Sequence, residues 1–243
     1  MTVRHVGARL KRPDDPRLLT GRGRYVDDLT LPRMAHVAFV RSPHAHAVIA
    51  GIECDAARRD PGVLAVLTGA DAARLCKPYR GVLLHYAGMK TGAMLPLATD
   101  RARYVGEPVV AVAAGSRALA EDACELVEVA YEPLPALADV DHALAPDAPA
   151  IFDEVGGNLM FEGHWTYGDP DAGFTSAART KRWRFTQHRL CNAPLEGRAG
   201  LVDHDPDTGD LTYHAAHQNP HAIRLWIAEL LGMPAHRFHV RTD

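Results

Sequence analysis

Near the carboxyl end of the chain, apolar positions recur with the period of a helix. They fall at i, i+3, i+4, i+7 and i+8, on Ile223, Trp226, Ile227, Leu230 and Leu231. This spacing predicts an amphipathic helix that buries one face. Asn219 is a favoured N-cap and Pro220 a favoured first helical residue, while Gly232 and Pro234 are stop signals. We therefore expect a helix that begins at Pro220 and ends before Gly232.

A short pattern of period two follows this helix. Residues 237–241 alternate polar and apolar side chains, as a strand with one buried face does. On the other side of the helix, Gln218 lies where a strand is expected to pass into the helix N-terminus. Its side-chain amide both donates and accepts hydrogen bonds, and a helix N-terminus carries a partial positive charge. This position indicates one edge of a binding site.

Five earlier segments have the apolar and β-branched composition of strands. They are 36–40, 47–49, 63–67, 109–114 and 127–131. After the fourth segment, Ser116 is a favoured N-cap, and Leu119, Ala120 and Ala123 fall on one inward face of the helix that it begins. The sequence therefore predicts a compact β-α-β element at this point.

Two further features organise the rest of the chain. Residues 201–213 are predicted to form two strands that are joined by a turn at Asp205–Gly209. This turn has Pro at its second position and a Gly that tolerates positive φ. Residues 137–150 are rich in Ala, Asp and Pro and show no periodicity, which is typical of a linker. The sequence thus predicts an α+β fold in two parts, residues 1–136 and 151–243.

Composition excludes several classes of protein. The 243 residues carry a formal net charge of -3 with scattered Lys and Arg, which argues against a nucleic-acid-binding surface. The longest strongly apolar stretch, 109–114, is far shorter than a membrane span, so we expect a cytoplasmic protein without membrane contact. Cys54, Cys76, Cys124 and Cys191 are widely separated and form no C-x-x-C motif. We expect them to be small buried thiols, with neither an iron–sulfur cluster nor a structural zinc.

Two clusters of polar residues suggest metal ligands, but neither has the required spacing. His214, His217 and His221 lie close together in sequence, yet His217 precedes the N-cap and shares no helical face with His221. Residues 203–207 carry alternating Asp, as the start of a calcium loop does, but the glycine and the glutamate that such a loop needs are missing. We therefore expect no metal ion bound by protein side chains.

Several separated segments, taken in order, resemble one known family. They are 15–21 (DPRLLTG), 41–47 (RSPHAHA), 61–63 (PGV), 105–109 (VGEPV), 120–123 (AEDA), 129–135 (VAYEPLP), Asn158, Gly168-Asp169, Phe174, 194–198 (PLEGR) and 218–221 (QNPH). This ordered set resembles the large subunits of the molybdenum hydroxylases, the group of xanthine dehydrogenase, aldehyde oxidase and carbon monoxide dehydrogenase. The resemblance covers essentially the whole chain, but only the amino-terminal part of the family's large subunit.

The resemblance implies a fold and a set of cofactors. Residues 1–136 would form the aldehyde oxidase/xanthine dehydrogenase α/β hammerhead domain, 137–150 a linker, and 151–243 the first part of a mixed α/β molybdopterin-binding domain. That part would end before the family's glycine-rich G-G-x-F-G loop. The implied cofactor is molybdenum-molybdopterin, only partly bound by this chain, with iron–sulfur clusters and FAD on partner subunits. The implied partners are these subunits and the carboxy-terminal half of the large subunit.

The resemblance also assigns site residues. Gln218 matches the glutamine whose side-chain amide approaches an oxygen ligand on molybdenum, and His217 stands where the family usually has Thr. Glu196 and Arg198 match a segment near the substrate side, so they are possible site-lining residues. Alternatively, since side chains two apart on a strand share a face, they simply form an ion pair. We expect no catalytic residue here, because the family's catalytic glutamate lies near the far end of the subunit.

The resemblance implies the oxidative hydroxylation of an aldehyde, an N-heterocycle or a similar small molecule. We expect the isolated chain to be inactive, either as the product of a split gene or as a truncated piece of a longer subunit. The alternative is a non-catalytic module that uses the hammerhead fold for binding or scaffolding and is a stable monomer. The family hypothesis instead predicts an unpaired strand edge after residue 237.

Overall fold

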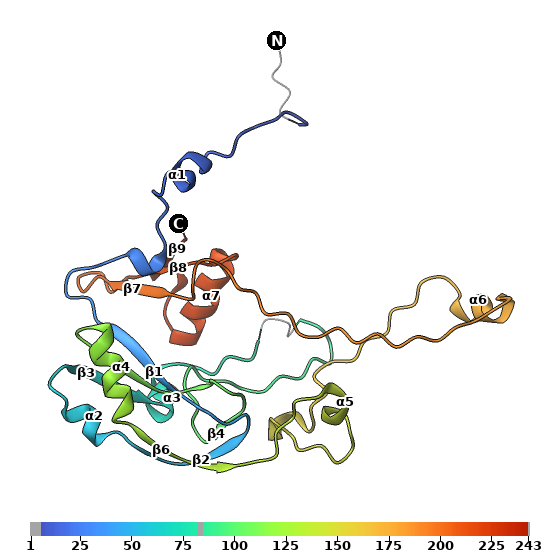
Figure 1. Cartoon of the computed structure of the whole chain (residues 1–243), viewed down its shortest axis with the longest axis horizontal. Coiled ribbons are helices and arrows are strands. Elements are labelled where there is room, and N and C mark those ends of the chain that lie inside the picture. The colour runs from blue at the N-terminus through green and yellow to red at the C-terminus, as the bar shows by residue number, and fades with distance from the viewer. Residues whose placement is uncertain (1–5, 82–84, 243) are drawn as a thin grey trace. The chain divides into compact units, whose positions relative to one another are not determined.

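A computed structural model describes residues 6–81 and 85–242 (Figure 1). By their internal contacts, the residues fall into two compact units. The larger unit comprises residues 33–193 with 230–232, and the smaller one comprises 1–32, 194–229 and 233–243.

The larger unit contains two three-stranded sheets. The first has the order β1-β5-β3 and is antiparallel throughout, with strands His36–Arg41 (β1), Val63–Thr68 (β3) and Pro108–Ala114 (β5). The second has the order β4-β2-β6, also antiparallel, with strands Ala47–Glu53 (β2), Arg101–Ala102 (β4) and Glu128–Pro133 (β6). All five strands expected in this region are therefore confirmed.

The core of the larger unit centres on β5. Val109, Val110 and Val112 are fully buried, and they belong to a cluster with small residues such as Ala57 and Ala123. β5 is the central strand of its sheet, so both of its edges are paired with neighbouring strands. Burial of these valines contributes to the hydrophobic stabilisation of the unit.

Helix α4 (Arg117–Glu125) forms as expected, but two details of the prediction for this region are wrong. The Ser116 hydroxyl accepts a hydrogen bond from the Leu119 N–H at 3.3 Å, and Ala123 is buried. Leu119, however, is 41% exposed, and its side chain lies over the bare backbone of Gly62. The strands on either side of α4 belong to different sheets, so they do not form a β-α-β element within one sheet.

The remaining short helices of the chain connect these elements or lie outside the sheets. They are α1 (Asp15–Leu19), α2 (Asp55–Arg59), α3 (Gly69–Leu75), α5 (Val140–Ala143), α6 (Pro170–Ser176), and the 3₁₀ turns η1 (Val26–Asp28), η2 (Asp153–Val155) and η3 (Ala235–Arg237).

One side-chain amide anchors the predicted linker segment. The Asn158 Oδ1 accepts a hydrogen bond from the Ile151 N–H at 3.1 Å, and its Nδ2 donates to the carbonyl oxygens of Ala143 and Pro149, at 3.0 Å each. Residues 137–150 contain the short helix α5, so this segment has local structure of its own. The domain boundary placed there stays a prediction.

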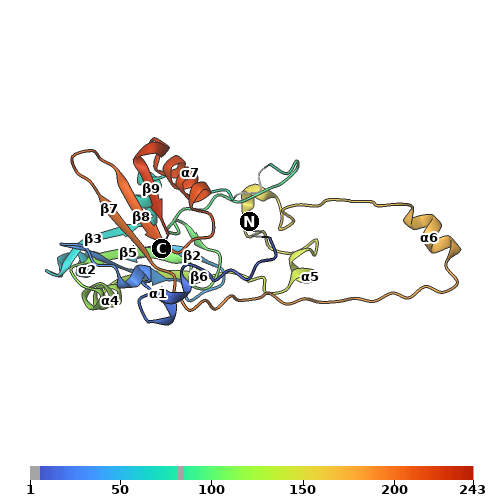
Figure 2. The ribbon, with the colours of Figure 1, turned by 90° about the horizontal axis from the view of Figure 1, so that it is seen from above.

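The smaller unit is built on a three-stranded sheet of order β7-β8-β9, with strands Gly200–His204 (β7), Leu211–Ala215 (β8) and Phe238–Arg241 (β9). Strands β7 and β8 are antiparallel and joined at Asp205–Gly209, where Gly209 has φ +73°, so the predicted hairpin is confirmed. Strands β8 and β9 are parallel and connected through α7 (Pro220–Leu231), which lies next to them (Figures 1 and 2). Within the described residues, β9 pairs only with β8, so its outer edge is unpaired as predicted.

Helix α7 begins and ends at the expected residues. The Asn219 Oδ1 accepts a hydrogen bond from the Ala222 N–H at 3.2 Å, and Gly232 takes φ +66° after the last turn. The apolar face predicted to be buried is covered only in part: Ala228 is buried, Leu231 is 42% exposed, and the other predicted residues are half-buried, namely Ile223, Trp226, Ile227 and Leu230. Since the sheet of this unit is only three strands wide, it leaves part of the helix uncovered.

The four cysteines are free thiols and differ in exposure. Cys54 is buried, and burial raises the pKa of the Cys54 and Cys124 thiols. Cys191 is exposed, which corrects the expectation that all four are buried, because it lies in a segment without helix or strand.

Candidate functional site

Gln218 lies in the bend between the end of β8 and the start of α7. Its side chain is exposed and makes no hydrogen bond or ion pair with any residue that the structure describes. Both the donor and the acceptor of the amide are therefore available to a ligand.

The order of β8, α7 and β9 determines which groups this bend offers to a ligand. Parallel strands joined through a helix place the carboxyl end of the first strand beside the helix N-terminus. The N-terminal turn carries backbone N–H groups without helical partners and a partial positive charge. In open α/β sheets, ligands bind outside the carboxyl ends of the strands. Gln218 lies at such a position.

His217 holds the backbone on both sides of Gln218. Its ring nitrogen Nδ1 accepts a hydrogen bond from the Asn219 N–H at 3.0 Å. Because Nδ1 is the acceptor, the neutral ring carries its proton on Nε2. From the sequence, His217 was expected neither to bind a metal ion nor to hold this turn, and it differed from the residue usual in the family. A polar side chain one residue before the amide and two before an N-cap was the signal for this local turn.

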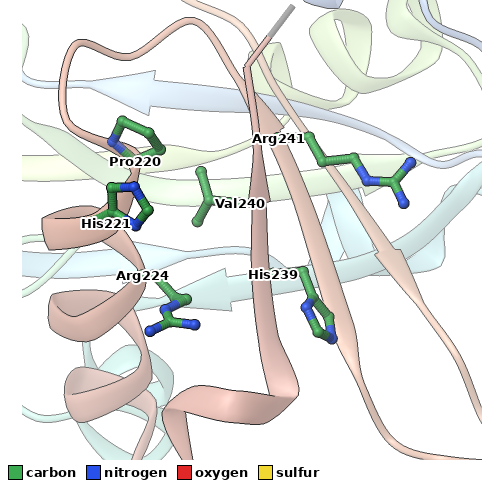
Figure 3. Close-up of a pocket in the computed structure, with 6 residues that line it drawn as sticks. All are labelled: Pro220, His221, Arg224, His239, Val240 and Arg241. Atoms are coloured by element: carbon green, nitrogen blue, oxygen red, sulfur yellow. The ribbon is translucent and has the colours of Figure 1, made fainter.

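A cavity of about 330 Å³ lies beside the first turns of α7 (Figure 3). It is lined by Pro220, His221 and Arg224 of α7 and by His239, Val240 and Arg241 of β9. In Figure 3, Val240 points toward α7, whereas the side chains of His239 and Arg241 point to the opposite side of β9. The basic side chains that face the cavity are therefore His221 and Arg224, and none of its lining residues is acidic.

A second cavity of about 370 Å³ is lined by Asp203, Asp205, Asp210, Thr212, His239 and Arg241. Here the Asp210 carboxylate accepts a hydrogen bond from the Arg237 Nε at 3.1 Å. Its second oxygen lies 3.4 Å from the His239 Nε2. The hydrogen bond from Arg237 is the main reason why the pKa of Asp210 is lowered. These contacts hold the end of the hairpin against β9.

Glu196 and Arg198 precede β7 and do not lie on a strand. The Glu196 carboxylate accepts a hydrogen bond from the Val26 N–H at 3.0 Å, and no ion pair joins it to Arg198 within the described part of the chain. The ion-pair interpretation is therefore wrong, because Glu196 ties down the segment around η1 instead. A role of either residue in lining the site stays a prediction.

Protein side chains do not assemble a metal site in the described regions. Among residues 6–81 and 85–242, no three His, Cys, Asp or Glu side chains are arranged so that they could hold a metal ion. Nor does any helix of these residues have the length and apolar character needed to span a membrane. What the smaller unit offers a ligand is a set of hydrogen-bond donors, including Gln218 and Arg224.

Two family profiles match the chain in succession. The profile described as "Aldehyde oxidase and xanthine dehydrogenase, a/b hammerhead domain" matches residues 20–135. The profile described as "Molybdopterin cofactor-binding domain" matches residues 151–243, which include Gln218.

Curated relatives agree with these profiles. The chain is 39% identical to the carbon monoxide dehydrogenase large chain of Afipia carboxidovorans, over 97% of this chain and 30% of the relative. It is 38% identical to the nicotine 6-hydroxylase large subunit of Paenarthrobacter nicotinovorans, over 97% of this chain and 29% of the relative. The chain therefore spans about 30% of the length of the curated relatives that it matches.

The solved structure of quinoline 2-oxidoreductase from Pseudomonas putida 86 is also similar. It has a TM-score of 0.89 and 37% sequence identity, with 96% of this chain and 30% of that chain covered. The expected fold, a hammerhead domain followed by the beginning of a molybdopterin-binding domain, is thereby confirmed. The chain belongs to the family of molybdenum hydroxylase large subunits and corresponds to their amino-terminal part.

Proposed function

We propose that the chain forms the amino-terminal part of a molybdenum-cofactor oxidoreductase and that Gln218 contacts the cofactor. The observation that carries this proposal is the position of Gln218, whose free amide lies between β8 and the N-terminus of α7. This bend belongs to the segment that matches the molybdopterin cofactor-binding domain.

The residues present fit such a cofactor, because they supply hydrogen bonds rather than metal ligands. With no cluster of metal-binding side chains among the described residues, the metal would be held by the molybdopterin itself. The bound cofactor would supply the two-electron oxidation of the substrate. Gln218 would donate its amide N–H to an oxygen of the cofactor, a hydrogen bond that contributes about 1.5–3 kcal/mol when its acceptor is charged.

The turn around Gln218 would orient this amide. The His217 to Asn219 hydrogen bond spans the glutamine and restricts its backbone before a ligand arrives. The partial positive charge at the N-terminus of α7 would favour an anionic or electron-rich group at the same place. Glu196 and Arg198 remain possible site-lining residues on the substrate side.

The substrate and partner classes belong to the same proposal. The substrate would be an aldehyde, an N-heterocycle or a similar small molecule. Relatives are named large chain, large subunit or complex subunit, which supports an assembly with other subunits. We propose that these carry iron–sulfur clusters and FAD, that a carboxy-terminal part completes the cofactor site, and that the protein is cytoplasmic.

The test is a chimera in which residues 1–243 replace the matching part of the carbon monoxide dehydrogenase large chain. We expect the purified chimera, assembled with its partner subunits, to contain stoichiometric molybdenum, and the 243-residue chain alone to contain almost none. Mass spectrometry of the metal content measures both. Stoichiometric molybdenum in the lone chain would show that it holds the cofactor without a carboxy-terminal part. A folded chimera without molybdenum would contradict the role of the chain in cofactor binding.

A further inference from the structure

Residues 178–193 form a long exposed segment whose composition is not that of a loop. All of these residues belong to the described part of the chain, all are exposed, and they form neither helix nor strand. Figures 1 and 2 draw the segment in orange, as an extended trace after α6. It contains no Gly and no Pro. Gly and Pro dominate turns, and loops longer than roughly 12–15 residues are uncommon in compact domains.

The segment has instead the sequence pattern of a β-strand. Polar and aromatic side chains alternate from Arg182 to Thr186, so Trp183 and Phe185 would share one face of a strand. Trp, Phe and Thr are also residues that strands favour. The side chains of Trp183 and Phe185 are 71% and 89% exposed, respectively. The pattern therefore predicts a strand with one buried face, and that face is open to solvent in this chain.

The backbone of the segment is equally available for pairing. No backbone N–H or carbonyl group of residues 178–193 bonds to another backbone group among the residues described. On the polar face, Arg184 forms an ion pair with Asp141 of α5. Since successive side chains of an extended segment point to opposite faces, this pair leaves Trp183 and Phe185 on the face away from Asp141. An extended backbone with free hydrogen-bonding groups and an aromatic face can add to the edge of another sheet.

We propose that residues 181–187 dock as a β-strand on a sheet of the carboxy-terminal part of the large subunit, with Trp183 and Phe185 buried against that sheet. This inference rests on the proposed function, in which a carboxy-terminal part completes the cofactor site. The segment lies within residues 151–243, which match the molybdopterin cofactor-binding domain, and the chain spans only about 30% of the length of its curated relatives. Docking would pair the free backbone groups and remove the aromatic face from water.

Hydrogen exchange of the peptide containing residues 179–190 tests this docking. It is measured in the 243-residue chain and in the chimera with the carbon monoxide dehydrogenase large chain, assembled with its partner subunits. We expect fast exchange in the lone chain and exchange that is roughly 100-fold slower or more in the chimera, because paired amides exchange only after local opening. Equally fast exchange in the assembled chimera overturns the proposal. Slow exchange in the lone chain also overturns it, since the segment would then pair within the chain or with a second copy.

Two neighbouring residues on opposite faces of the strand supply a matched pair of variants. Trp183→Ser should speed exchange of this peptide in the chimera by roughly tenfold or more, because a buried aromatic side chain is lost. Arg182→Ser removes a side chain from the polar face and should have a much smaller effect. Equal effects of the two variants would contradict burial of the aromatic face.

A chimera that does not assemble is replaced by two separate polypeptides, residues 1–243 and the carboxy-terminal part of the same relative. We expect them to co-purify, with less co-purification in Trp183→Ser and no change in Arg182→Ser. Failure of the unmodified pair to co-purify counts against the proposal. Molybdenum content distinguishes this failure from failure of the proposed function. A protected segment without molybdenum supports docking and contradicts the cofactor role, and molybdenum with an unprotected segment does the reverse.

Discussion

The anchoring of residues 143–151 by Asn158 allows a stability prediction with a worked magnitude. Asn158→Ala removes three hydrogen bonds, from the Ile151 N–H and to the carbonyl oxygens of Ala143 and Pro149. Each contributes about 1 kcal/mol, and because Asn158 is only partly buried, water replaces some of the lost partners. We therefore expect local opening of this segment to become easier by about 1–3 kcal/mol.

Hydrogen exchange of the peptide containing residues 140–160 measures this opening. The expected change corresponds to exchange that is roughly 5-fold to 150-fold faster in Asn158→Ala, since 1.4 kcal/mol is a factor of ten. Asn158→Asp is the more discriminating variant. It keeps an oxygen that accepts from the Ile151 N–H, but it replaces the Nδ2 donor by an oxygen that faces the carbonyl oxygens of Ala143 and Pro149 and cannot donate to them. Its exchange should be at least as fast as that of the alanine variant.

The matched control is Asn192→Ala, an exposed asparagine whose side chain makes no hydrogen bond with the residues described. Exchange in the 140–160 peptide should be unchanged in this variant. The reasoning is refuted if Asn158→Ala exchanges like the wild type, or if Asn158→Asp restores full protection. Either result would mean that apolar contacts, and not the amide, hold the segment.

Three further predictions concern single side chains. Burial raises the pKa of Glu107 above its ordinary value near 4.5. The protonated Glu107 side chain therefore contributes its full stabilisation of the fold below that value, and this stabilisation is lost as pH rises through the raised pKa. Glu107→Gln should therefore be more stable than the wild type at pH 7 in urea unfolding, and a less stable variant would contradict this. For Asp210 the pKa shifts in the opposite direction, because the hydrogen bond from Arg237 lowers it below 3.8. The stabilisation of the fold by the Asp210 carboxylate is therefore present above that value and is lost as pH falls through the lowered pKa. Asp210→Asn should flatten the acid limb of the unfolding profile, and an unchanged acid limb would count against the contact. His217→Ala should speed hydrogen exchange of the Asn219 amide, and equal exchange in both proteins would show that the ring does not hold the turn.

Elements with strong local signals could be predicted from the sequence. Helix α7 has its cap, its proline and its terminal glycine within a few residues of one another, so its bounds follow from local chemistry. The hairpin of β7 and β8 follows in the same way from its Asp, Pro and Gly turn. The fold family was predicted from the ordered set of motifs, and no single segment would have been enough. The role proposed for Gln218 rests on the same set of motifs.

Contacts between distant residues could not be predicted in this way. The pairing of β2 with β6, and of β1 with β5, depends on which strands meet in space, and apolar composition alone does not encode that choice. The bond from Val26 to Glu196 joins residues 170 positions apart, so reasoning from neighbouring positions missed it. Leu119 has the same helical spacing as Ala120 and Ala123, yet it is 41% exposed while they are buried, because burial depends on which elements pack over each side chain.

The most direct test of the central claim is a crystal structure of the molybdenum-loaded chimera, with data collected on both sides of the molybdenum absorption edge. Anomalous scattering locates the metal independently of the protein model. We predict that the metal lies beside the bend between β8 and α7 and that an oxygen ligand on it accepts a hydrogen bond from the Gln218 side chain. A molybdenum peak elsewhere, with Gln218 facing solvent, would contradict the account.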